Sequence, residues 1–191
     1  MIPQPLDAVI FDMDGVLLDT EPLYRTAIFA ACADQGREMA DHVHLSLIGT
    51  PKDLGDTKLL AHFEHGFEID LYHAACSRHF SRLCRSAVPL RPGARRLLRY
   101  LRQRKLPVGI ATSTARTTAE AQLRAADIFD LIDVLVTRSD VANGKPHPES
   151  FLRAAQCLNA RPSSCLALED SHSGIRAAAA AGRATVMIPG A

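Results

Sequence analysis

Five short runs of apolar, β-forming residues recur along the chain, and helical patterns separate them. The runs are AVIF at 8–11, VGIAT at 108–112, DVLVT at 133–137, CLALED at 165–170 and ATVMI at 184–188. Strands that alternate with helices on this scale form a parallel sheet joined by right-handed crossovers. The pattern therefore predicts an α/β fold with a parallel sheet.

One interval breaks this alternation. Between about Leu23 and Val88 no comparable strand occurs, and the sequence shows helical patterns such as PLYRTAIFAACADQG, DLGDTKLLAHFEHG and IDLYHAACSRHFSRLC. The flanking stretches DTEP and PLRPG contain prolines and a glycine, which suit connecting segments. We expect a helical insertion over 21–88 in a domain formed by 1–20 and 89–191.

The stretch from Gly93 to Lys105 is predicted to form an amphipathic helix. Its leucines and its arginines fall on different faces of a 3.6-residue period. The arginine face could bind phosphate, but the pattern favours a face that is exposed to solvent, as is usual for helices that cover a sheet. The residues are Leu97, Leu98 and Leu101 on one face, and Arg95, Arg99 and Arg102 on the other.

Charge and composition favour a small-molecule partner. The 22 basic and 21 acidic residues give a net charge of +1, so no global field favours nucleic acid or an anionic membrane. The start MIPQPLDAVIF has no basic segment before a long apolar stretch, and no window approaches a membrane span of about 20 apolar residues. We expect a cytoplasmic protein whose five cysteines are reduced thiols, mostly in the core.

Asp12 and Asp14 follow the first apolar run in the stretch VIFDMDGVLLDTEPLY. Residues two apart in a strand point to the same side, so the two carboxylates should converge. Their repulsion would fall if one kept its proton or if a cation lay between them. The alternative is an ordinary turn at the end of a strand, because Asp and Gly both suit turns.

Polar groups also follow the other strands. Ligands of open parallel sheets bind at the carboxyl ends of the strands, where these groups would meet. Each has a structural alternative as a helix cap, a surface lysine or an acidic helix start. The groups are Thr112, Ser113 and Thr114 in ATST, Lys145 in NGKPHPESF, and Glu169 and Asp170 in LEDSHSG.

These residue types together fit phosphate chemistry. Several carboxylates at one rim call for a hard divalent cation, and oxygen ligands suit Mg²⁺, with Asp12 and Asp170 as the expected side-chain ligands. Lys145 can balance the charge of a phosphoryl group while the hydroxyl of Thr112 donates a hydrogen bond to it. A carboxylate in contact with phosphorus can attack it and form an aspartyl phosphate.

FDMDGVLLDTEP, ATST, GKPHPESF and LEDSHSGIRAA resemble, in order, the four motifs of the haloacid dehalogenase superfamily. The resemblance implies a Rossmann-like core with the small helical cap of the β-phosphoglucomutase-like branch. It implies that Asp12 is the nucleophile and Asp14 the general acid and base, whose main-chain carbonyl also reaches Mg²⁺. It further implies phosphate-binding groups at Thr112 and Lys145, a metal ligand at Asp170 and an outer-sphere or direct metal partner at Glu169; Ser113, beside Thr112, is also expected to bind phosphate.

The favoured function is a Mg²⁺-dependent phosphatase that acts on a small phosphomonoester such as a sugar or polyol phosphate. The alternatives are a β-phosphoglucomutase-like phosphoryl shuttle and a non-catalytic binding form of the fold. Mutases of this branch carry a histidine shortly after the first motif, where this chain has Tyr24. That difference weakens the mutase interpretation.

The cap of such proteins largely determines specificity, and LIGTPKD at 47–53 resembles the cap loop that faces the active site. Glu21, Thr50, Lys52 and Arg78 are therefore candidate substrate contacts, with surface charge as the alternative for Lys52 and Arg78. The expected partner is a phosphorylated small molecule, neither nucleic acid nor membrane, bound by a monomer.

Overall fold

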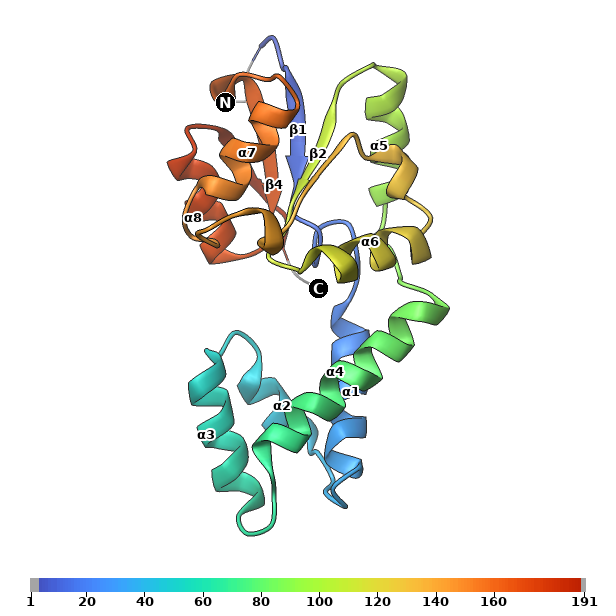
Figure 1. Ribbon diagram of the computed structural model, residues 1–191, viewed down its shortest axis with the longest axis vertical. Coiled ribbons are helices and arrows are strands. Elements are labelled where there is room, and N and C mark those ends of the chain that lie inside the picture. The colour runs from blue at the N-terminus through green and yellow to red at the C-terminus, as the bar shows by residue number, and fades with distance from the viewer. Residues whose placement is uncertain (1–3, 190–191) are drawn as a thin grey trace. The chain divides into compact units, whose positions relative to one another are not determined.

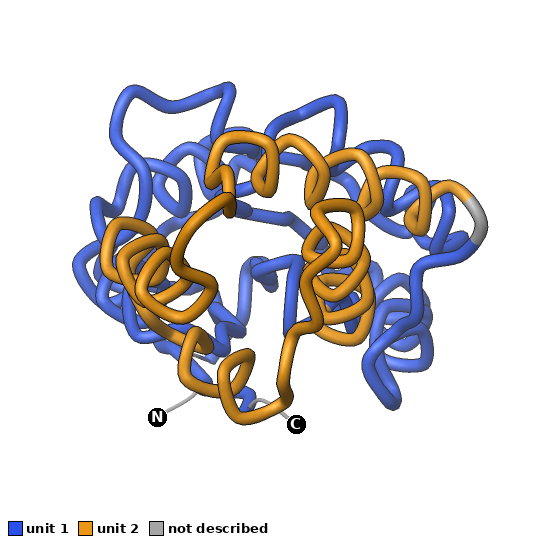
Figure 2. The backbone as a smooth tube through the Cα atoms, turned by 90° about the horizontal axis from the view of Figure 1, so that it is seen from below, with its two compact units in different colours: residues 1–20, 87–191 blue, residues 21–86 orange. Residues whose placement is uncertain are grey.

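The computed structural model describes residues 4–189 (Figure 1). The chain divides into two compact units, which Figure 2 distinguishes by colour. Unit 1 consists of Met1–Thr20 and Ala87–Ala191, and unit 2 is the intervening segment Glu21–Ser86. The predicted domain of 1–20 and 89–191 includes residues 1–3 and 190–191, which lie outside the residues that the structure describes.

A five-stranded parallel sheet forms the centre of unit 1, in the order β3-β2-β1-β4-β5. Apolar β-forming residues occupy these strands, and β1 and β2 are buried throughout. The predicted α/β class with a parallel sheet is thus confirmed, and each strand falls within its predicted run. The strands are β1 (Ala8–Phe11), β2 (Val108–Ala111), β3 (Val134–Val136), β4 (Cys165–Glu169) and β5 (Ala184–Met187).

The register of the sheet brings two predicted site segments side by side. Phe11, the last residue of β1, pairs with Leu168 of β4. The amide of Asp12 continues this pairing by donating to the carbonyl oxygen of Leu168 at 2.9 Å. Asp12 therefore lies beside Glu169 at the carboxyl ends of adjacent strands.

Helices cover the sheet of unit 1 (Figure 1). Helix α7 packs against β1, β2 and β3, and α8 packs against β4 and β5, while α5 contacts β2. The predicted amphipathic helix is α5, in which Leu98 and Leu101 are buried and Leu97 is 38% exposed. These helices are α5 (Ala94–Gln103), α6 (Arg116–Ala125), α7 (Glu149–Cys157) and α8 (His172–Ala180).

Unit 2 is helical. Its core gathers Cys32 and Ala31 of α1 with apolar residues of the other helices, among them Val43, Leu59 and Phe63. The sequence patterns predict three of its helices but miss α2, which is too short to show a helical period. The helices are α1 (Glu21–Ala33), α2 (Asp41–Leu47), α3 (Lys52–Phe63) and α4 (Ile69–Ser86).

Within residues 4–189 the cysteines form no disulfide bond: Cys32, Cys84 and Cys165 are buried, Cys76 is partly buried and Cys157 is exposed. Within residues 4–189, no helix has the length and hydropathy needed to cross a membrane.

Candidate active site

The turn after β1 brings Asp12 and Asp14 to the rim of the sheet. Asp12 is buried, and Asp14 is partly buried. Gly15 has a φ of +76°, which favours glycine, and a Cβ atom there would overlap the carboxylate of Asp170. The glycine of this motif thus lets the turn approach Asp170 closely.

Lys145 joins two of the predicted carboxylates. Its Nζ lies 2.5 Å from Oδ1 of Asp12 and also donates to Oε1 of Glu169. The lysine side chain is only 4% exposed, and its Nζ lies 5.1 Å from the centre of the Phe151 ring. A buried ammonium group is therefore fixed between β1 and β4.

Glu169 is itself held on both oxygens. Its side chain is completely buried, and Oε2 accepts hydrogen bonds of 2.9 Å from both the amide and the hydroxyl of Ser171. Ser171 also caps α8 by accepting from the amide of Gly174 at 3.0 Å. A Cβ atom at Gly174 would overlap the Glu169 carboxylate, so this glycine makes room for the cluster.

The charges at this rim perturb one another. The pKa of Asp12 is raised to about 7, mainly by burial and in part by the charges of Glu169 and Asp14, against the lowering effect of Lys145. Burial and the charge of Glu169 also raise the pKa of Asp170. Burial alone would lower the pKa of Lys145, but Asp12 and Glu169 outweigh it and raise that pKa. The single ammonium group of Lys145 therefore does not neutralise the negative charge of these carboxylates.

Asp12, Glu169 and Asp170 form a group that could hold a metal ion, because one oxygen of each lies within 4.8 Å of the others. An all-oxygen set of carboxylates is the donor set that hard divalent cations prefer. The raised pKa values of Asp12 and Asp170 are further support, since a cation would stabilise both in their charged form. The residues present therefore fit a divalent metal.

Two hydroxyl groups hold the carboxylate of Asp14. Thr20 Oγ1 donates to Oδ1 and Thr114 Oγ1 donates to Oδ2, each at 2.9 Å. Thr20 is not among the predicted site residues, and Thr114 is among them only as part of ATST. The sequence signal for Thr114 is its hydroxyl group just after a predicted strand. Thr20 follows no predicted strand directly, so the sequence gives no signal for it.

The structure also locates the predicted phosphate-binding hydroxyls. Thr112 is buried after β2, and its Oγ1 accepts from the amide of Thr114 at 3.0 Å. The Thr112 hydroxyl donates no hydrogen bond to residues 4–189, so its proton is available to a ligand. Ser113 is exposed beside it. Thr112, Lys145 and the carboxylates thus come from the ends of neighbouring strands or from the loop that follows β3.

The loop that carries Lys145 is held by side-chain contacts. After β3, Thr137 and Asp140 form a capping box around the short helix η2 (Arg138–Asp140). Arg116 of α6 donates to Asp140 at 2.7 Å. Glu149, the first residue of α7, accepts from the amides of Ala142 and Asn143 at 2.8 and 2.9 Å. These contacts fix both ends of the segment that positions the lysine.

The candidate substrate contacts Glu21, Thr50, Lys52 and Arg78 all lie in unit 2. Glu21 is exposed at the start of α1, and Lys52 pairs with Asp56 at 2.8 Å within α3. The hydroxyl of Thr50 donates to the carbonyl oxygen of Ser46 at 3.0 Å. Arg78 lies 3.7 Å from Asp34. Their contacts are therefore within unit 2.

Comparison with known proteins points to one family. A model described as haloacid dehalogenase-like hydrolase matches residues 6–182. A phosphorylated carbohydrates phosphatase of Thermotoga maritima is 34% identical over 177 residues, which are 93% of this chain and 82% of the relative. Hexitol phosphatase B of Escherichia coli K12 is 30% identical over 201 residues, 98% of this chain and 85% of the relative.

Among solved structures, the fold is similar to that of a candidate β-phosphoglucomutase from Thermotoga maritima. The TM-score is 0.83 and the identity 34%, with 93% of this chain and 82% of the other chain covered.

Proposed function

The chain belongs to the haloacid dehalogenase-like hydrolase family, and from this membership we propose that it is a Mg²⁺-dependent phosphatase of small phosphomonoesters. The predicted family is thus confirmed, and the relatives named as phosphatases of phosphorylated carbohydrates and hexitols agree with the predicted activity. Sugar and polyol phosphates are accordingly the proposed substrates.

The observation that carries the proposal is the ammonium group of Lys145, buried between Asp12 and Glu169 at the ends of β1 and β4. A buried lysine in contact with a carboxylate nucleophile can neutralise a phosphoryl group that arrives at the same position. The Thr112 hydroxyl and the exposed Ser113 would donate further hydrogen bonds to the phosphoryl oxygens. We assign these three residues to phosphate binding.

In the first step, a carboxylate oxygen of Asp12 attacks phosphorus and the bond from phosphorus to the ester oxygen breaks. Asp14 gives a proton to that oxygen, so that the product leaves as an alcohol. The hydroxyls of Thr20 and Thr114, which contact both oxygens of Asp14, orient its carboxyl group for this transfer.

In the second step, a water molecule attacks the phosphorus of the aspartyl phosphate. Asp14 now accepts a proton from that water, inorganic phosphate leaves, and the Asp12 carboxylate is restored. The same carboxyl group therefore acts as acid and then as base, and the protons balance over one cycle.

Mg²⁺ would be held by the side chains of Asp12 and Asp170 and the main-chain carbonyl of Asp14, with Glu169 beside them. When bound, it would neutralise negative charge on the phosphoryl group. Both oxygens of Glu169 are already engaged by Lys145 and Ser171, so we propose that its main contribution is to fix the lysine.

A phosphoryl shuttle of the β-phosphoglucomutase type is the second candidate, and the structural similarity to a candidate enzyme of that name favours it. Against it stands Tyr24, whose ring stacks on Phe80 at 3.8 Å within unit 2. A phenol with a reference pKa of about 10 does not supply the charged contact of a histidine near neutral pH. We therefore place hydrolysis first.

We further propose that unit 2 is the cap and contributes to specificity through Glu21, Thr50, Lys52 and Arg78. The proposed partner is a phosphorylated small molecule rather than nucleic acid or membrane, and the proposed working form is a cytoplasmic monomer. The net charge of +1 and the relatives named as phosphatases support the phosphorylated small molecule as partner.

A phosphatase screen tests the proposal. The purified chain is assayed for release of inorganic phosphate from sugar, polyol and nucleoside monophosphates, with Mg²⁺ and with excess EDTA. We expect turnover of at least one sugar or polyol phosphate that depends on Mg²⁺. β-Glucose 1-phosphate with a trace of glucose 1,6-bisphosphate is included, and formation of glucose 6-phosphate without phosphate release would favour the mutase instead.

A further inference from the structure

A hollow on unit 1, here called the arginine hollow, has a basic lining. Its volume is about 700 Å³, and it lies along α5 and the residues that precede this helix. Four arginines line it together with Tyr100 and Gln103, and no carboxylate is among its lining residues. The arginines are Arg91, Arg95, Arg96 and Arg99.

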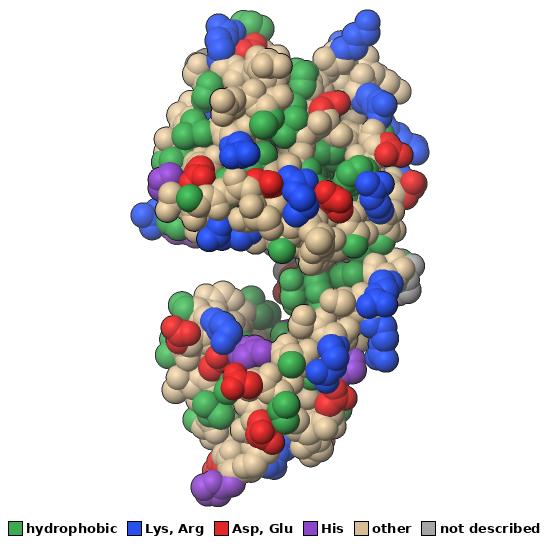
Figure 3. All heavy atoms as spheres, viewed as in Figure 1, with side chains coloured by type: hydrophobic (Ala, Val, Ile, Leu, Met, Phe, Trp, Pro, Cys, Tyr) green, Lys and Arg blue, Asp and Glu red, His purple; other side chains and the backbone are tan. Residues whose placement is uncertain are grey.

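The basic charge is local to this part of the chain. The stretch RPGARRLLRYLRQRK at 91–105 has six arginines, one lysine and no acidic residue, whereas the whole chain has a net charge of +1. Figure 3 shows several basic side chains over the part of unit 1 where α5 and α6 lie in that view. Like charges at helical spacings of three and four residues repel each other, and this repulsion lowers the stability of the helix.

Two of these guanidinium groups form hydrogen bonds within unit 1. Arg95 donates to the carboxylate of Asp127 at 2.6 Å and to the carbonyl oxygen of Ala126 at 2.7 Å. Arg91 donates to the carbonyl oxygen of Pro189 at 3.0 Å. These contacts tie α5 and its preceding loop to the rest of unit 1.

Arg96 and Arg99 differ from these arginines. Both are exposed, and within residues 4–189 neither side chain makes a hydrogen bond or an ion pair. They lie three positions apart on one helix, which places them on neighbouring parts of its surface. Both side chains line the arginine hollow, which has no acidic side chain in its lining, and Arg99 also borders a separate hollow lined by Asp127 and Asp130.

We propose that the arginine hollow binds a soluble ligand that carries two or more linked phosphoryl groups, with Arg96 and Arg99 as its main contacts. Guanidinium groups match phosphoryl oxygens in bidentate geometry, and such charge-assisted hydrogen bonds are the strong ones. A single phosphoryl group would leave much of the lining charge unbalanced. A di- or polyphosphate matches it better.

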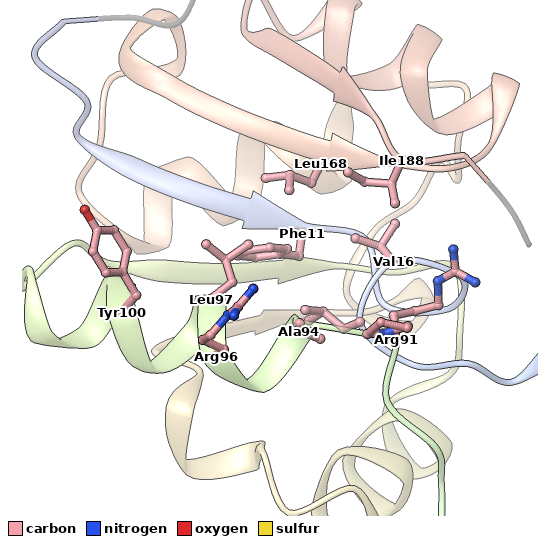
Figure 4. A pocket seen from close by; sticks show the side chains of 12 residues that line it. Phe11, Val16, Arg91, Ala94, Arg96, Leu97, Tyr100, Leu168 and Ile188 are labelled. Atoms are coloured by element: carbon pink, nitrogen blue, oxygen red, sulfur yellow. The ribbon is translucent and has the colours of Figure 1, made fainter.

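A neighbouring apolar hollow of about 580 Å³ shares Arg91, Arg96 and Tyr100 with the arginine hollow. Figure 4 shows Arg96 and Tyr100 extending from α5 at its edge, with Phe11, Leu97 and Leu168 among the apolar lining. The guanidinium group of Arg96 thus lies where two concave surfaces meet. Neither hollow is lined by Asp12, Lys145 or Asp170, so the proposed site does not depend on the proposed phosphatase activity.

Isothermal titration with inorganic pyrophosphate tests the inference. The titration is run in EDTA at low and matched ionic strength, so that no metal brings pyrophosphate to the carboxylate cluster. We expect one pyrophosphate per chain, bound at least tenfold more tightly than orthophosphate. The double variant Arg96→Ala/Arg99→Ala should weaken pyrophosphate binding at least tenfold and leave the hydrolysis of the best phosphomonoester within twofold of wild type.

The matched control is Arg153→Ala/Arg176→Ala, which removes the same charge from exposed positions of α7 and α8. It should change pyrophosphate affinity by less than twofold. An equal loss in both double variants would show only attraction by net charge and would overturn the inference. Absence of pyrophosphate binding to wild type, or equal affinity for orthophosphate, would overturn it as well.

Discussion

At the residue scale, the site is an excess of carboxylates around one buried ammonium group. Asp12 and Glu169 both contact Lys145, and Asp170 lies close enough to complete a possible metal site. Burial removes the water that would otherwise stabilise the charges, and the pKa of Asp12 rises to about 7 as a result. The arrangement therefore favours binding of a cation.

We predict that the hydroxyl groups of Thr20 and Thr114 orient Asp14 for proton transfer. Replacing both in Thr20→Val/Thr114→Val removes the hydrogen bonds of 2.9 Å to its two carboxylate oxygens. Because proton transfer by a positioned group contributes about 10²–10⁴-fold to rate, loss of its orientation should lower kcat by roughly 10-fold to 100-fold. KM should change far less.

Steady-state kinetics on the best phosphomonoester provide the measurement, with Thr118→Val on the exposed surface of α6 as the control. A double variant with wild-type kcat would show that the two hydroxyls do not orient Asp14.

At the scale of single elements, the carboxyl ends of β1 and β4 and the start of α8 determine where the charged groups lie. Two glycines make this packing possible, because a Cβ atom at Gly15 would overlap Asp170 and one at Gly174 would overlap Glu169. The side chains of the site and the backbone of these elements are thus packed directly together.

We predict opposite effects for two helical glycines. Gly174→Ala should lower the free energy of unfolding by about 1–3 kcal/mol, because the new methyl group displaces the buried Glu169 carboxylate. Gly55→Ala in α3 should raise it by up to about 1 kcal/mol, since its Cβ would meet only Leu47 at an ordinary 3.8 Å. Urea denaturation compares the two, and equal changes in stability would refute the packing argument.

In the loop before Lys145, the contribution of Asp140 to the free energy of unfolding should depend on pH. Partial burial would raise the pKa of Asp140, but hydrogen bonds from Thr137 and Arg116 outweigh it and hold that pKa below its usual value. A lowered pKa means that Asp140 stabilises the fold above the unfolded-state pKa of about 4 and loses this effect as the pH falls through the folded-state pKa.

Asp140→Asn should therefore cost about 1–2 kcal/mol of unfolding free energy at pH 7, as expected for lost capping and hydrogen bonds. The difference from wild type should shrink as the pH is lowered from about 4 to 2. Denaturation at several pH values measures it, with the exposed Asp130→Asn as control. A difference that stays constant with pH would argue against the ionised Asp140 as its source.

The elements differ in how far the sequence predicts them. Alternating runs indicate all five strands, because the strands of a parallel sheet are rich in apolar β-formers, and this holds even for β5, in which Val186 and Met187 are exposed. Helix α2 is missed because its seven residues are too few to establish a period. Asp12, Lys145 and Asp170 could be found from their positions after strands, whereas Thr20 contacts Asp14 only through the folded turn.

At the scale of the whole molecule, the predicted nucleophile, acid and base, phosphate-binding groups and metal ligands all lie in unit 1. Unit 2 has its own core around Cys32, Phe63 and Tyr72 and contains the candidate specificity residues. This separation agrees with a proposed division between chemistry and substrate choice. Sequence reasoning could not identify the substrate, because the proposed specificity contacts involve few residues of unit 2 and no sequence pattern shows which molecule they bind.

Metal binding should also be visible in global stability. Because Mg²⁺ would bind the folded cluster and not the unfolded chain, a concentration 100 times Kd should add about 2.7 kcal/mol to the free energy of unfolding. Asp170→Asn should largely abolish this gain, whereas Asp130→Asn should keep it. Thermal denaturation with and without Mg²⁺ measures the effect. Equal stabilisation of the Asp170→Asn variant would exclude Asp170 as a ligand.

Nucleophilic attack of Asp12 on phosphorus is checked by the phosphatase activity of the Asp12→Asn variant in Mg²⁺. The asparagine keeps the shape of the side chain and removes the nucleophile together with a buried charge, so the fold should be as stable as wild type or more so. We predict no turnover above a trace, with full activity in Asp130→Asn. An Asp12→Asn variant that folds normally and still hydrolyses the substrate at a substantial fraction of the wild-type rate would rule out Asp12 as the nucleophile.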